Sequence, residues 1–364
     1  MTRVLIVDDS PFVCRLLASY IQSSPDLEVA GVAHGGREAV AKVRELRPDV
    51  VTMDLDMPGV DGLQAVRQIM TESPVPVLVV SGVSGSAATR TLQALDYGAV
   101  DFILKYTPGV NTDAAALTKE ILAKVRAGAH TRVVRLLGHR DSIPHPPPPK
   151  FDKEMLERFE TQQSSSMPSV VVVIGASTGG PLALRELLSE LPADMPAAVL
   201  IVQHLPRNFT SALAAQLRRY CGLEVREAED GDTLHAGLVL VAPGGYHLLA
   251  RPSMRVAVQS GPEVDGHCPS IDVTMESAAF AYGSRVAGVV LTGMGEDGTK
   301  GLRAIRSKGG IAYAQEPESC VVNGMPQSAV DAGLVEHLGT PAGIGRMLAA
   351  AFKSGERRIY AAAS

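Results

Sequence analysis

Short apolar runs alternate with helix-like segments in two series along this chain, and this alternation constrains its fold more than any other feature. Runs such as Val4–Val7 and Val50–Met53 are separated by segments whose apolar residues recur at helical spacing. This alternation is typical of a parallel sheet with helices on both faces. We therefore predict an α/β fold with two sheets, the second mostly parallel and doubly wound, with an antiparallel hairpin between His247 and Gln259. The predicted strands are 4–7, 27–33, 50–53, 77–80 and 100–104 in the first series, and 170–174, 198–203, 238–242, 286–291 and 310–314 in the second.

Residues 128–168 interrupt the alternation with a proline-rich run, 144–149, and a serine run, 164–166. Prolines stiffen a linker and serines loosen it. We therefore predict an interdomain linker there, joining a first domain of residues 1–127 to a second domain of residues 169–352.

Composition and charge exclude several classes of protein. The 364 residues carry a formal net charge of −5, which gives no general attraction to nucleic acid or to an anionic membrane. No apolar run approaches the roughly 20 residues that span a bilayer, and the first run stops at Asp8, too soon for a secretory signal. The four cysteines are scattered without a Cys-x-x-Cys pair, which argues against disulfides or structural zinc and indicates the reducing cytoplasm.

Polar residues close four of the strands predicted in the first half. Asp8 and Asp9 follow the first strand, and Asp54 follows the third. Because the carboxyl ends of parallel strands meet at one edge, these carboxylates would crowd together, and Mg²⁺ suits such an all-oxygen cluster. Ser81 and Lys105 end the next two strands and add a hydroxyl and a positive charge. The set predicts phosphoryl transfer to one of the aspartates.

The first third of the chain resembles the receiver domain of two-component response regulators, a flavodoxin-like (βα)5 fold. The resemblance implies that Asp54 is the phosphoacceptor. It also implies that Mg²⁺ is bound by Asp8, Asp9 and Asp54, with the backbone carbonyl of Asp56. The segments that carry it are Val-Asp-Asp-Ser (7–10), Met-Asp-Leu-Asp-Met-Pro-Gly-Val-Asp-Gly (53–62), Ser81-Gly82 and Gly-Ala-Val-Asp-Phe-Ile-Leu-Lys (98–105).

The same resemblance implies a conformational switch next to the phosphoacceptor. Ser81 and Phe102 would be the switch pair, and Lys105 would contact the phosphoryl group. Tyr106 departs from the family, which usually has proline after this lysine.

Residues 170–180 read Val-Val-Val-Val-Ile-Gly-Ala-Ser-Thr-Gly-Gly, an apolar strand that ends in a glycine-bounded serine. Gly175 and Gly179 permit a sharp turn, and Pro181 suits the first turn of a helix. This strand–turn–helix pattern would expose Ser177 beside free backbone N–H groups, as a serine nucleophile in acyl transfer requires. A phosphate-binding loop or an ordinary turn has the same pattern, so the motif alone leaves three interpretations open.

Two further residues favour the nucleophile. A serine hydroxyl needs a base, and the base needs an orienting acid. His204 follows the strand 198–203, and Asp297 follows the strand 286–291, so both would lie at the same sheet edge as Ser177. The order Ser, His, Asp differs from that of α/β-hydrolases. No acidic residue ends the second strand of this half, which weakens a dinucleotide-binding alternative.

Other polar residues compete for roles in this site. His247 is an alternative base and Glu296 an alternative acid, whereas Asp272 is expected to cap or orient the helix that follows it. The remaining histidines are expected at the surface or in the linker, namely His34, His130, His139, His145, His235, His267 and His337.

The second half resembles the chemotaxis protein-glutamate methylesterases, the response regulators called CheB, and a receiver in front completes their domain order. The resemblance implies that Ser177, His204 and Asp297 form the triad and that the backbone N–H groups of Thr178 and Met294 hold the oxyanion. The matching runs are Ile-Gly-Ala-Ser-Thr-Gly-Gly (174–180), Gln-His-Leu-Pro (203–206) with Phe209-Thr210, Ala-Pro-Gly-Gly-Tyr-His (242–247), Pro-Ser-Ile-Asp (269–272), Leu-Thr-Gly-Met-Gly-Glu-Asp-Gly (291–298) and Gly-Met-Pro (324–326).

The activity implied is hydrolysis of methyl esters on glutamate side chains of chemoreceptors, with release of methanol and without a cofactor, for adaptation in chemotaxis. The family also deamidates receptor glutamines. The implied partners are methyl-accepting chemoreceptors and a chemotaxis histidine kinase, with no nucleic acid and no insertion into the membrane. Phosphorylation of Asp54 would relieve a block that the receiver imposes on the catalytic edge.

Two alternatives remain at this point. The second half could be a phosphorylation-gated binding module whose triad is vestigial. The same esterase chemistry could also serve a chemosensory array that does not control flagella.

Overall fold

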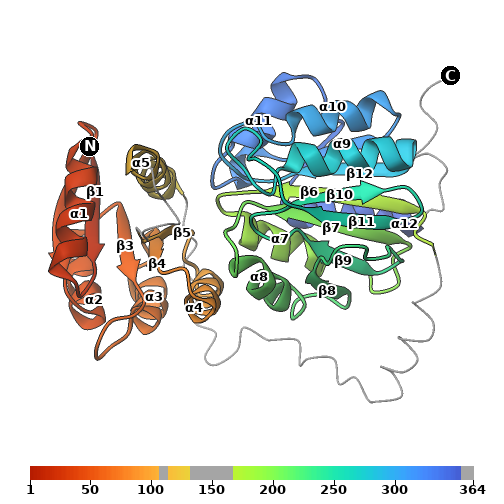
Figure 1. Cartoon of the computed structure of the whole chain (residues 1–364). Coiled ribbons are helices and arrows are strands. Elements are labelled where there is room, and N and C mark those ends of the chain that lie inside the picture. Colours follow the sequence, from red (N-terminus) through yellow and green to blue (C-terminus); the bar gives the residue numbers. More distant parts are fainter. Residues whose placement is uncertain (106–113, 132–166, 354–364) are drawn as a thin grey trace, which may run out of the picture. The chain divides into compact units, whose positions relative to one another are not determined.

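The computed structural model describes residues 1–105, 114–131 and 167–353 (Figure 1). The chain divides into two compact units, Met1–Ile143 and Pro144–Ser364. Tyr106 and most of the predicted linker lie outside the described residues. Within the described ranges, no helix is both long and apolar enough to cross a membrane.

The first unit has the predicted alternation of strands and helices. Its elements are β1 (Thr2–Val7), α1 (Pro11–Gln22), β2 (Leu27–Ala33), α2 (Gly36–Leu46), β3 (Val50–Asp54), α3 (Gly62–Glu72), β4 (Val77–Ser81), α4 (Gly85–Asp96), β5 (Asp101–Leu104) and α5 (Ala114–His130). They form a five-stranded parallel sheet in the order β2-β1-β3-β4-β5. Every residue of β3 and β4 is buried, because helices cover both faces of a parallel sheet.

Side-chain caps determine where three helices of this unit begin. Ser10, Asp61 and Ser84 each accept a hydrogen bond from a backbone N–H three residues further on. Such caps satisfy an N–H group that has no partner within the helix. They therefore anchor the loops at the sheet edge where β1, β3 and β4 end.

The second unit has a larger sheet than the alternation predicted. Its elements are β6 (Val170–Ala176), α7 (Gly180–Ser189), β7 (Ala197–Gln203), α8 (Phe209–Leu217), β8 (Glu224–Glu227), β9 (Leu238–Val241), β10 (His247–Arg251), β11 (Arg255–Gln259), α9 (Ile271–Tyr282), β12 (Val286–Val290), α10 (Thr299–Ser307), β13 (Ile311–Gln315), α11 (Gly324–Asp331), β14 (His337–Gly339) and α12 (Pro341–Lys353). Seven strands pair in the order β14-β13-β12-β6-β7-β9-β8, all of them parallel. The prediction missed the edge strands β8 and β14, which are short and partly exposed.

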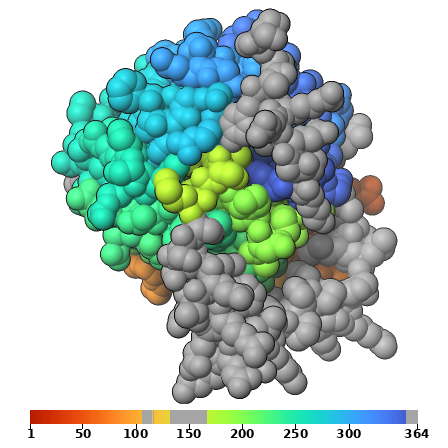
Figure 2. All heavy atoms as spheres, turned by 90° about the vertical axis from the view of Figure 1, so that its right-hand side faces the viewer, coloured from red at the N-terminus to blue at the C-terminus, as the bar shows by residue number. Residues whose placement is uncertain are grey.

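The predicted hairpin, β10–β11, is confirmed, but it forms a separate two-stranded sheet. Helices cover both faces of the main sheet, with α9 and α10 on one side and α7 and α8 on the other (Figure 1). Figure 2 views the second unit from the side where β6 begins. The first residues of β6, in yellow-green, lie there between the cyan part of the chain, which includes α9, and the green part, which includes α7. This arrangement buries all seven residues of β6 and all seven of β7.

The strand order of the main sheet reverses at β6. The chain passes from β6 to β7 on one side, and later returns to pair β12 on the other side. In open α/β sheets, sites form beyond the carboxyl ends of the strands at such a reversal. Ser177 is the first residue past β6, at this position.

Candidate active site and phosphoacceptor site

The turn that carries Ser177 is held by neighbours on both sides. Its backbone N–H donates to the Thr292 carbonyl at 3.0 Å, and its carbonyl accepts from Gln203 Nε2 at 2.8 Å. Gly179 follows with φ +76°, and a Cβ there would lie 2.5 Å from Val321, so this tight turn requires glycine. The predicted strand, turn and helix are all present.

Ser177 lies between the strand ends that carry the other two predicted triad residues. Its predecessor Ala176 pairs with Gln203, the residue before His204, and the His204 N–H donates to the Ala176 carbonyl at 3.1 Å. On the other side, a Cβ built on Gly293 would lie 2.7 Å from the Ser177 Cβ. The loop after β12 therefore closes against the serine from the side opposite His204.

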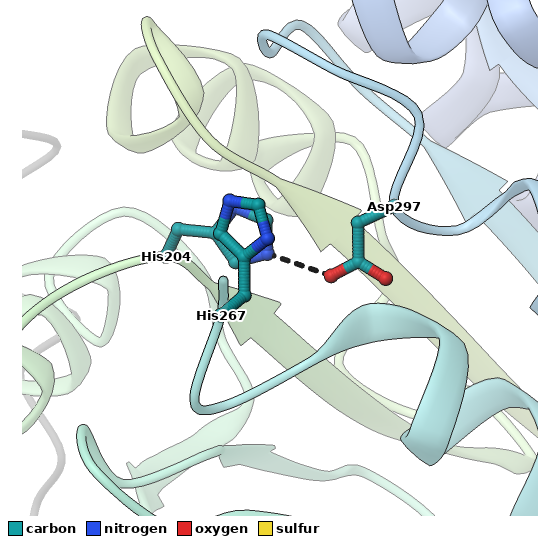
Figure 3. A group of neighbouring side chains, drawn as sticks. All are labelled: His204, His267 and Asp297. Carbon is teal, nitrogen blue, oxygen red and sulfur yellow. Dashed lines mark hydrogen bonds and ion pairs between the residues drawn. The ribbon is translucent and has the colours of Figure 1, made fainter. Parts of the chain in front are cut away.

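His204 and Asp297 are in direct contact (Figure 3). His204 Nε2 lies 2.9 Å from Asp297 Oδ2, and the two side chains are only 9% and 2% exposed. Burial alone would raise the pKa of Asp297, but hydrogen bonds from His204 and from backbone N–H groups lower it to about 2. Asp297 is therefore a carboxylate at neutral pH, and His204 Nε2 carries the proton of this hydrogen bond.

The other ring nitrogen of His204, Nδ1, is buried and has no hydrogen-bond partner among the described residues. Because Nε2 is protonated by its role as donor, Nδ1 carries the free lone pair in the neutral ring. No hydrogen bond joins Ser177 Oγ to His204 within the described part of the chain. Such contacts are often long before substrate binds, so Nδ1 remains the atom that can accept a proton at this site.

Asp297 is fixed by the start of α9. Its carboxylate accepts hydrogen bonds from the backbone N–H of Ile271 at 2.8 Å, from that of Asp272 at 2.9 Å and from the Ser270 hydroxyl at 3.1 Å. Free N–H groups at a helix N-terminus favour a negative charge. Asp297, the acid of the predicted triad, thus lies in the loop before α10 and contacts the start of α9.

The side chain of Asp272 makes the reverse connection. Its Oδ1 accepts from the backbone N–H of Gly298 at 2.9 Å and from that of Gly301 at 2.7 Å, at the start of α10. Asp272 was predicted to cap or orient the helix that follows it. Its carboxylate instead caps α10, because the loop from β12 to α10 folds back against α9. Burial raises its pKa to about 6, although the two backbone hydrogen bonds oppose that rise.

His267 is part of the site, and the prediction that it lies at the surface was wrong. Its ring stacks on that of His204 with 3.9 Å between centroids and 16° between planes (Figure 3). Burial and the neighbouring His204 lower its pKa, so the ring is neutral at pH 7. No local signal marks His267, since the contact arises only when the loop before α9 folds back over His204.

His204, His267 and Asp297 offer ligand atoms within 4.8 Å of one another. A metal ion lies in the plane of an imidazole that binds it. The two rings are stacked nearly parallel, so one ion cannot lie in the plane of both. This arrangement fits a water-excluding stack over the base better than a metal centre.

The rival base and acid have other positions. His247 is buried, and its ring nitrogens contact the Pro262 carbonyl at 2.9 Å and the Ser270 N–H at 3.3 Å. It therefore supports the loop that leads to α9, the helix whose start contacts Asp297. Glu296 is exposed and does not replace Asp297 as the partner of His204.

Two backbone donors predicted for the oxyanion are available. Within the described ranges, the N–H groups of Thr178 and Met294 donate no hydrogen bond. Thr178 follows the serine, and Met294 follows Gly293, which packs against the serine. Unpaired N–H groups beside a nucleophile are what stabilisation of an oxyanion requires.

The first unit gathers its predicted acidic residues at one sheet edge. Asp8, Asp9 and Asp54 offer carboxylate oxygens within 4.8 Å of one another. The Asp56 N–H donates to Asp54 Oδ1 at 3.2 Å, so the loop after β3 turns back over the same cluster. Hard oxygen donors in this number fit Mg²⁺.

Lys105 closes the cluster. Its Nζ lies 2.9 Å from Asp54 Oδ2 and 3.1 Å from Asp8 Oδ2. Burial alone would lower the pKa of Lys105, but the hydrogen bond and charge of Asp54, with those of Asp8, raise it. Burial raises the pKa of Asp8, and the charge of Asp54 adds to that rise, whereas the Ser10 N–H and Lys105 oppose it.

The two predicted switch residues are both buried. Ser81 accepts a hydrogen bond from the Thr91 hydroxyl of α4 at 2.7 Å. Lys124 donates to the Phe102 carbonyl at 2.7 Å, and its ammonium lies 5.1 Å from the centre of the Phe102 ring. Ser81 thus has a partner in α4 and Phe102 a partner in α5.

Both halves of the chain match known protein families. Residues 4–115 match the family described as response regulator receiver domain, and residues 172–348 match the family described as CheB methylesterase. A protein of Symbiobacterium thermophilum, named protein-glutamate methylesterase/protein-glutamine glutaminase, is 42% identical over 331 residues, which are 91% of each chain. A protein of Lawsonia intracellularis with the same name is 42% identical over 93% of this chain and 96% of its own.

Solved structures resemble the two units separately. The Thermotoga maritima CheB methylesterase catalytic domain is 37% identical and covers 51% of this chain and 99% of that one, with a TM-score of 0.49. The response regulator domain of Thermotoga maritima CheB is 41% identical and covers 36% of this chain and 98% of that one, with a TM-score of 0.33.

Proposed function

Because this chain belongs to the CheB methylesterase family, with a response regulator receiver domain in front, we propose that Ser177, His204 and Asp297 are its catalytic triad and that phosphorylation of Asp54 controls it. Its activity is that of a protein-glutamate methylesterase and protein-glutamine glutaminase, which serves adaptation in chemotaxis. The observation that supports the triad most is the contact of 2.9 Å between His204 and Asp297 at the edge where the strand before Ser177 ends.

In the proposed mechanism, Ser177 Oγ attacks the γ-carbonyl carbon of a methylated glutamate while His204 Nδ1 takes the hydroxyl proton. Asp297 stabilises the positive charge that develops on the ring. The negative oxygen of the tetrahedral intermediate accepts hydrogen bonds from the N–H groups of Thr178 and Met294. The intermediate then collapses, the proton passes from His204 to the departing methoxide, and methanol leaves an acyl-serine.

Water completes the cycle. His204 Nδ1 takes a proton from the water as it attacks the acyl carbon, and returns that proton to Ser177 Oγ when the ester breaks. The product is a free glutamate. With a glutamine substrate the leaving group is ammonia, and the acyl-serine and its hydrolysis are the same.

We propose that Asp54 takes a phosphoryl group from a chemotaxis histidine kinase in the cytoplasm. Asp8, Asp9, Asp54 and the carbonyl of Asp56 would hold Mg²⁺, which supplies positive charge against the phosphoryl oxygens when bound. Lys105, which contacts Asp54 at 2.9 Å, would move to the phosphoryl group. Ser81 would then leave Thr91 for a phosphoryl oxygen, and Phe102 would follow it.

The substrates of the proposed reaction are the methylated side chains of chemoreceptors. The test is the release of methanol from a methylated chemoreceptor by the full chain, with and without acetyl phosphate. We expect Ser177→Ala to abolish the release. We also expect a fluorophosphonate probe to react with the unchanged protein and not with Ser177→Ala. Retained methanol release by Ser177→Ala would end the triad proposal.

A further inference from the structure

Arg207 lies three residues after His204, in a segment whose backbone is tightly packed. A Cβ on Gly244 would lie 2.5 Å from the Pro206 carbonyl carbon and 2.6 Å from the Arg207 nitrogen. The Gly244 N–H also donates to the buried Thr210 hydroxyl at 3.1 Å. The main chain of Arg207, three residues after the proposed base, is therefore packed closely against the loop that carries Gly244.

The side chain of Arg207 is exposed, but it is held in place. Its guanidinium carbon lies 4.5 Å from the centre of the Tyr246 ring, within the range of a cation–π contact. A Cβ on Gly245 would lie only 2.6 Å from its Nε, so the side chain runs closely over this loop. A stacked guanidinium keeps its N–H donors free at the ring edge, and it loses less conformational entropy when it binds a ligand.

This cation has no carboxylate partner among residues 1–105, 114–131 and 167–353. Arg226, by contrast, pairs with Asp232 at 2.6 Å. The charge of Arg207 opposes the rise in the pKa of Cys268 that burial causes, so the guanidinium lies near the residue after His267. The Gly245 N–H donates to the Cys268 carbonyl at 3.0 Å, which joins the same loops.

From these observations we propose that Arg207 determines specificity by binding a free carboxylate of the substrate protein, one helical turn from the ester that is hydrolysed. This inference rests on the proposed function, because the ester must lie between Ser177 and His204. Side chains four residues apart lie on one face of a helix. A guanidinium held near the base can therefore bind the carboxylate of an acidic residue next to the modified glutamate. It would donate two parallel hydrogen bonds to the oxygens of that carboxylate.

The experiment uses the full chain and two helical peptides that differ at one position. Each carries one γ-methyl glutamate, and the residue four positions away is glutamate in one peptide and glutamine in the other. We expect the unchanged protein to release methanol from the acidic peptide with a kcat/KM about three- to fivefold higher at low salt. High salt should remove this preference, because the pair is exposed.

Variants separate charge from packing. Arg207→Gln should lose the preference while it keeps the wild-type rate on the glutamine peptide and the wild-type reaction with fluorophosphonate. Arg207→Lys should keep part of the preference, since it retains the charge but not the planar fork. Arg251→Gln, at the end of β10 away from the site, is the matched control and should keep the preference.

Each result decides between the two proposals. A preference that persists in Arg207→Gln, or equal rates of the unchanged protein on both peptides, overturns the role of Arg207 and leaves the esterase intact. Failure of the unchanged protein to release methanol from either peptide and from a methylated chemoreceptor overturns the proposed function, and the role of Arg207 with it.

Discussion

Asp297 caps α9, the helix that contains Asp272, and Asp272 caps α10, the helix that follows Asp297. Asp297 accepts from the N–H groups of Ile271 and Asp272 at the start of α9, and Asp272 accepts from those of Gly298 and Gly301 at the start of α10. The two carboxylates thus tie together two loops that are far apart in the sequence. The position of Asp297 depends on these contacts, which the measurements below can test.

Removing the Asp272 carboxylate should destabilise the second unit. Asp272→Ala leaves two buried N–H groups without an acceptor, at a cost of about 2–4 kcal/mol in the free energy of unfolding. Asp272→Asn keeps an acceptor oxygen and should cost less. Urea unfolding checks both, with the exposed Glu276→Gln on the same helix as the control. Equal stabilities of Asp272→Ala and the control would contradict the tie.

Asp272 should also make stability depend on pH. Its pKa is raised to about 6 in the folded chain, from an ordinary value of 3.8, so the folded state binds the extra proton between pH 4 and pH 6. The unfolding free energy should therefore fall as pH rises through this window, by about 2–3 kcal/mol relative to Asp272→Asn. Urea unfolding of both proteins at pH 4.5 and pH 7 measures this difference. A difference that does not change with pH would contradict the raised pKa.

Asp297→Asn should slow methanol release about 10²- to 10⁴-fold. An amide cannot stabilise the positive charge on His204, and it can turn an N–H toward Nε2 and so reverse the ring tautomer. The matched control is Glu296→Gln, one residue earlier and exposed, which should keep the wild-type kcat. Loss of activity in the control with retention in Asp297→Asn would assign the acid to Glu296.

The stacking of the His267 ring on His204 should affect kcat through the flat shape of the His267 ring. His267→Phe keeps a flat ring 3.9 Å from His204 and should keep kcat within about threefold. His267→Ala opens one face of His204 to water and lets the ring turn, and kcat should fall about tenfold, because small errors of position slow catalysis. Steady-state methanol release measures both. Equal rates for His267→Ala and the unchanged protein would remove His267 from the site.

Phosphorylation should require Asp54 and a divalent cation. Labelled acetyl phosphate with Mg²⁺ should modify the unchanged protein and Asp56→Asn, since Asp56 contributes only its carbonyl to the proposed metal site. Asp54→Asn should remain unlabelled, and EDTA should prevent labelling of the unchanged protein and of Asp56→Asn. Labelling of Asp54→Asn at the wild-type rate would assign the phosphoryl group to another residue.

The sequence allowed prediction of the elements whose signal is local. The valine-rich strands β3, β4 and β6 are mostly apolar and are buried along their whole length, because they are covered on both faces. The position of each polar residue at a strand end follows from parallel topology alone. The edge strand β8 was missed because an edge has an exposed side, and its sequence Glu-Val-Arg-Glu has no apolar run.

The parts of the site that escaped prediction depend on how loops fold back. His267 lies in the irregular segment before α9, and Asp272 lies in the first turn of that helix. The partner of the His267 ring is 63 residues away in the sequence, and those of the Asp272 carboxylate are 26 and 29 residues away. No spacing rule links such residues, because the loop that joins them takes its shape from packing. The partner of Ser81, Thr91, is likewise set by the way α4 lies on the sheet.

The crossed caps also bear on when the enzyme becomes active during its own synthesis. Asp297 can be oriented only when α9 is in place, and α9 is tied to the first turn of α10 through Asp272. A nascent chain that ends before Gly301 contains Ser177, His204 and Asp297, but it lacks the tie that holds Asp297 against His204. Both helices must therefore dock before Asp297 can hold the imidazole of His204.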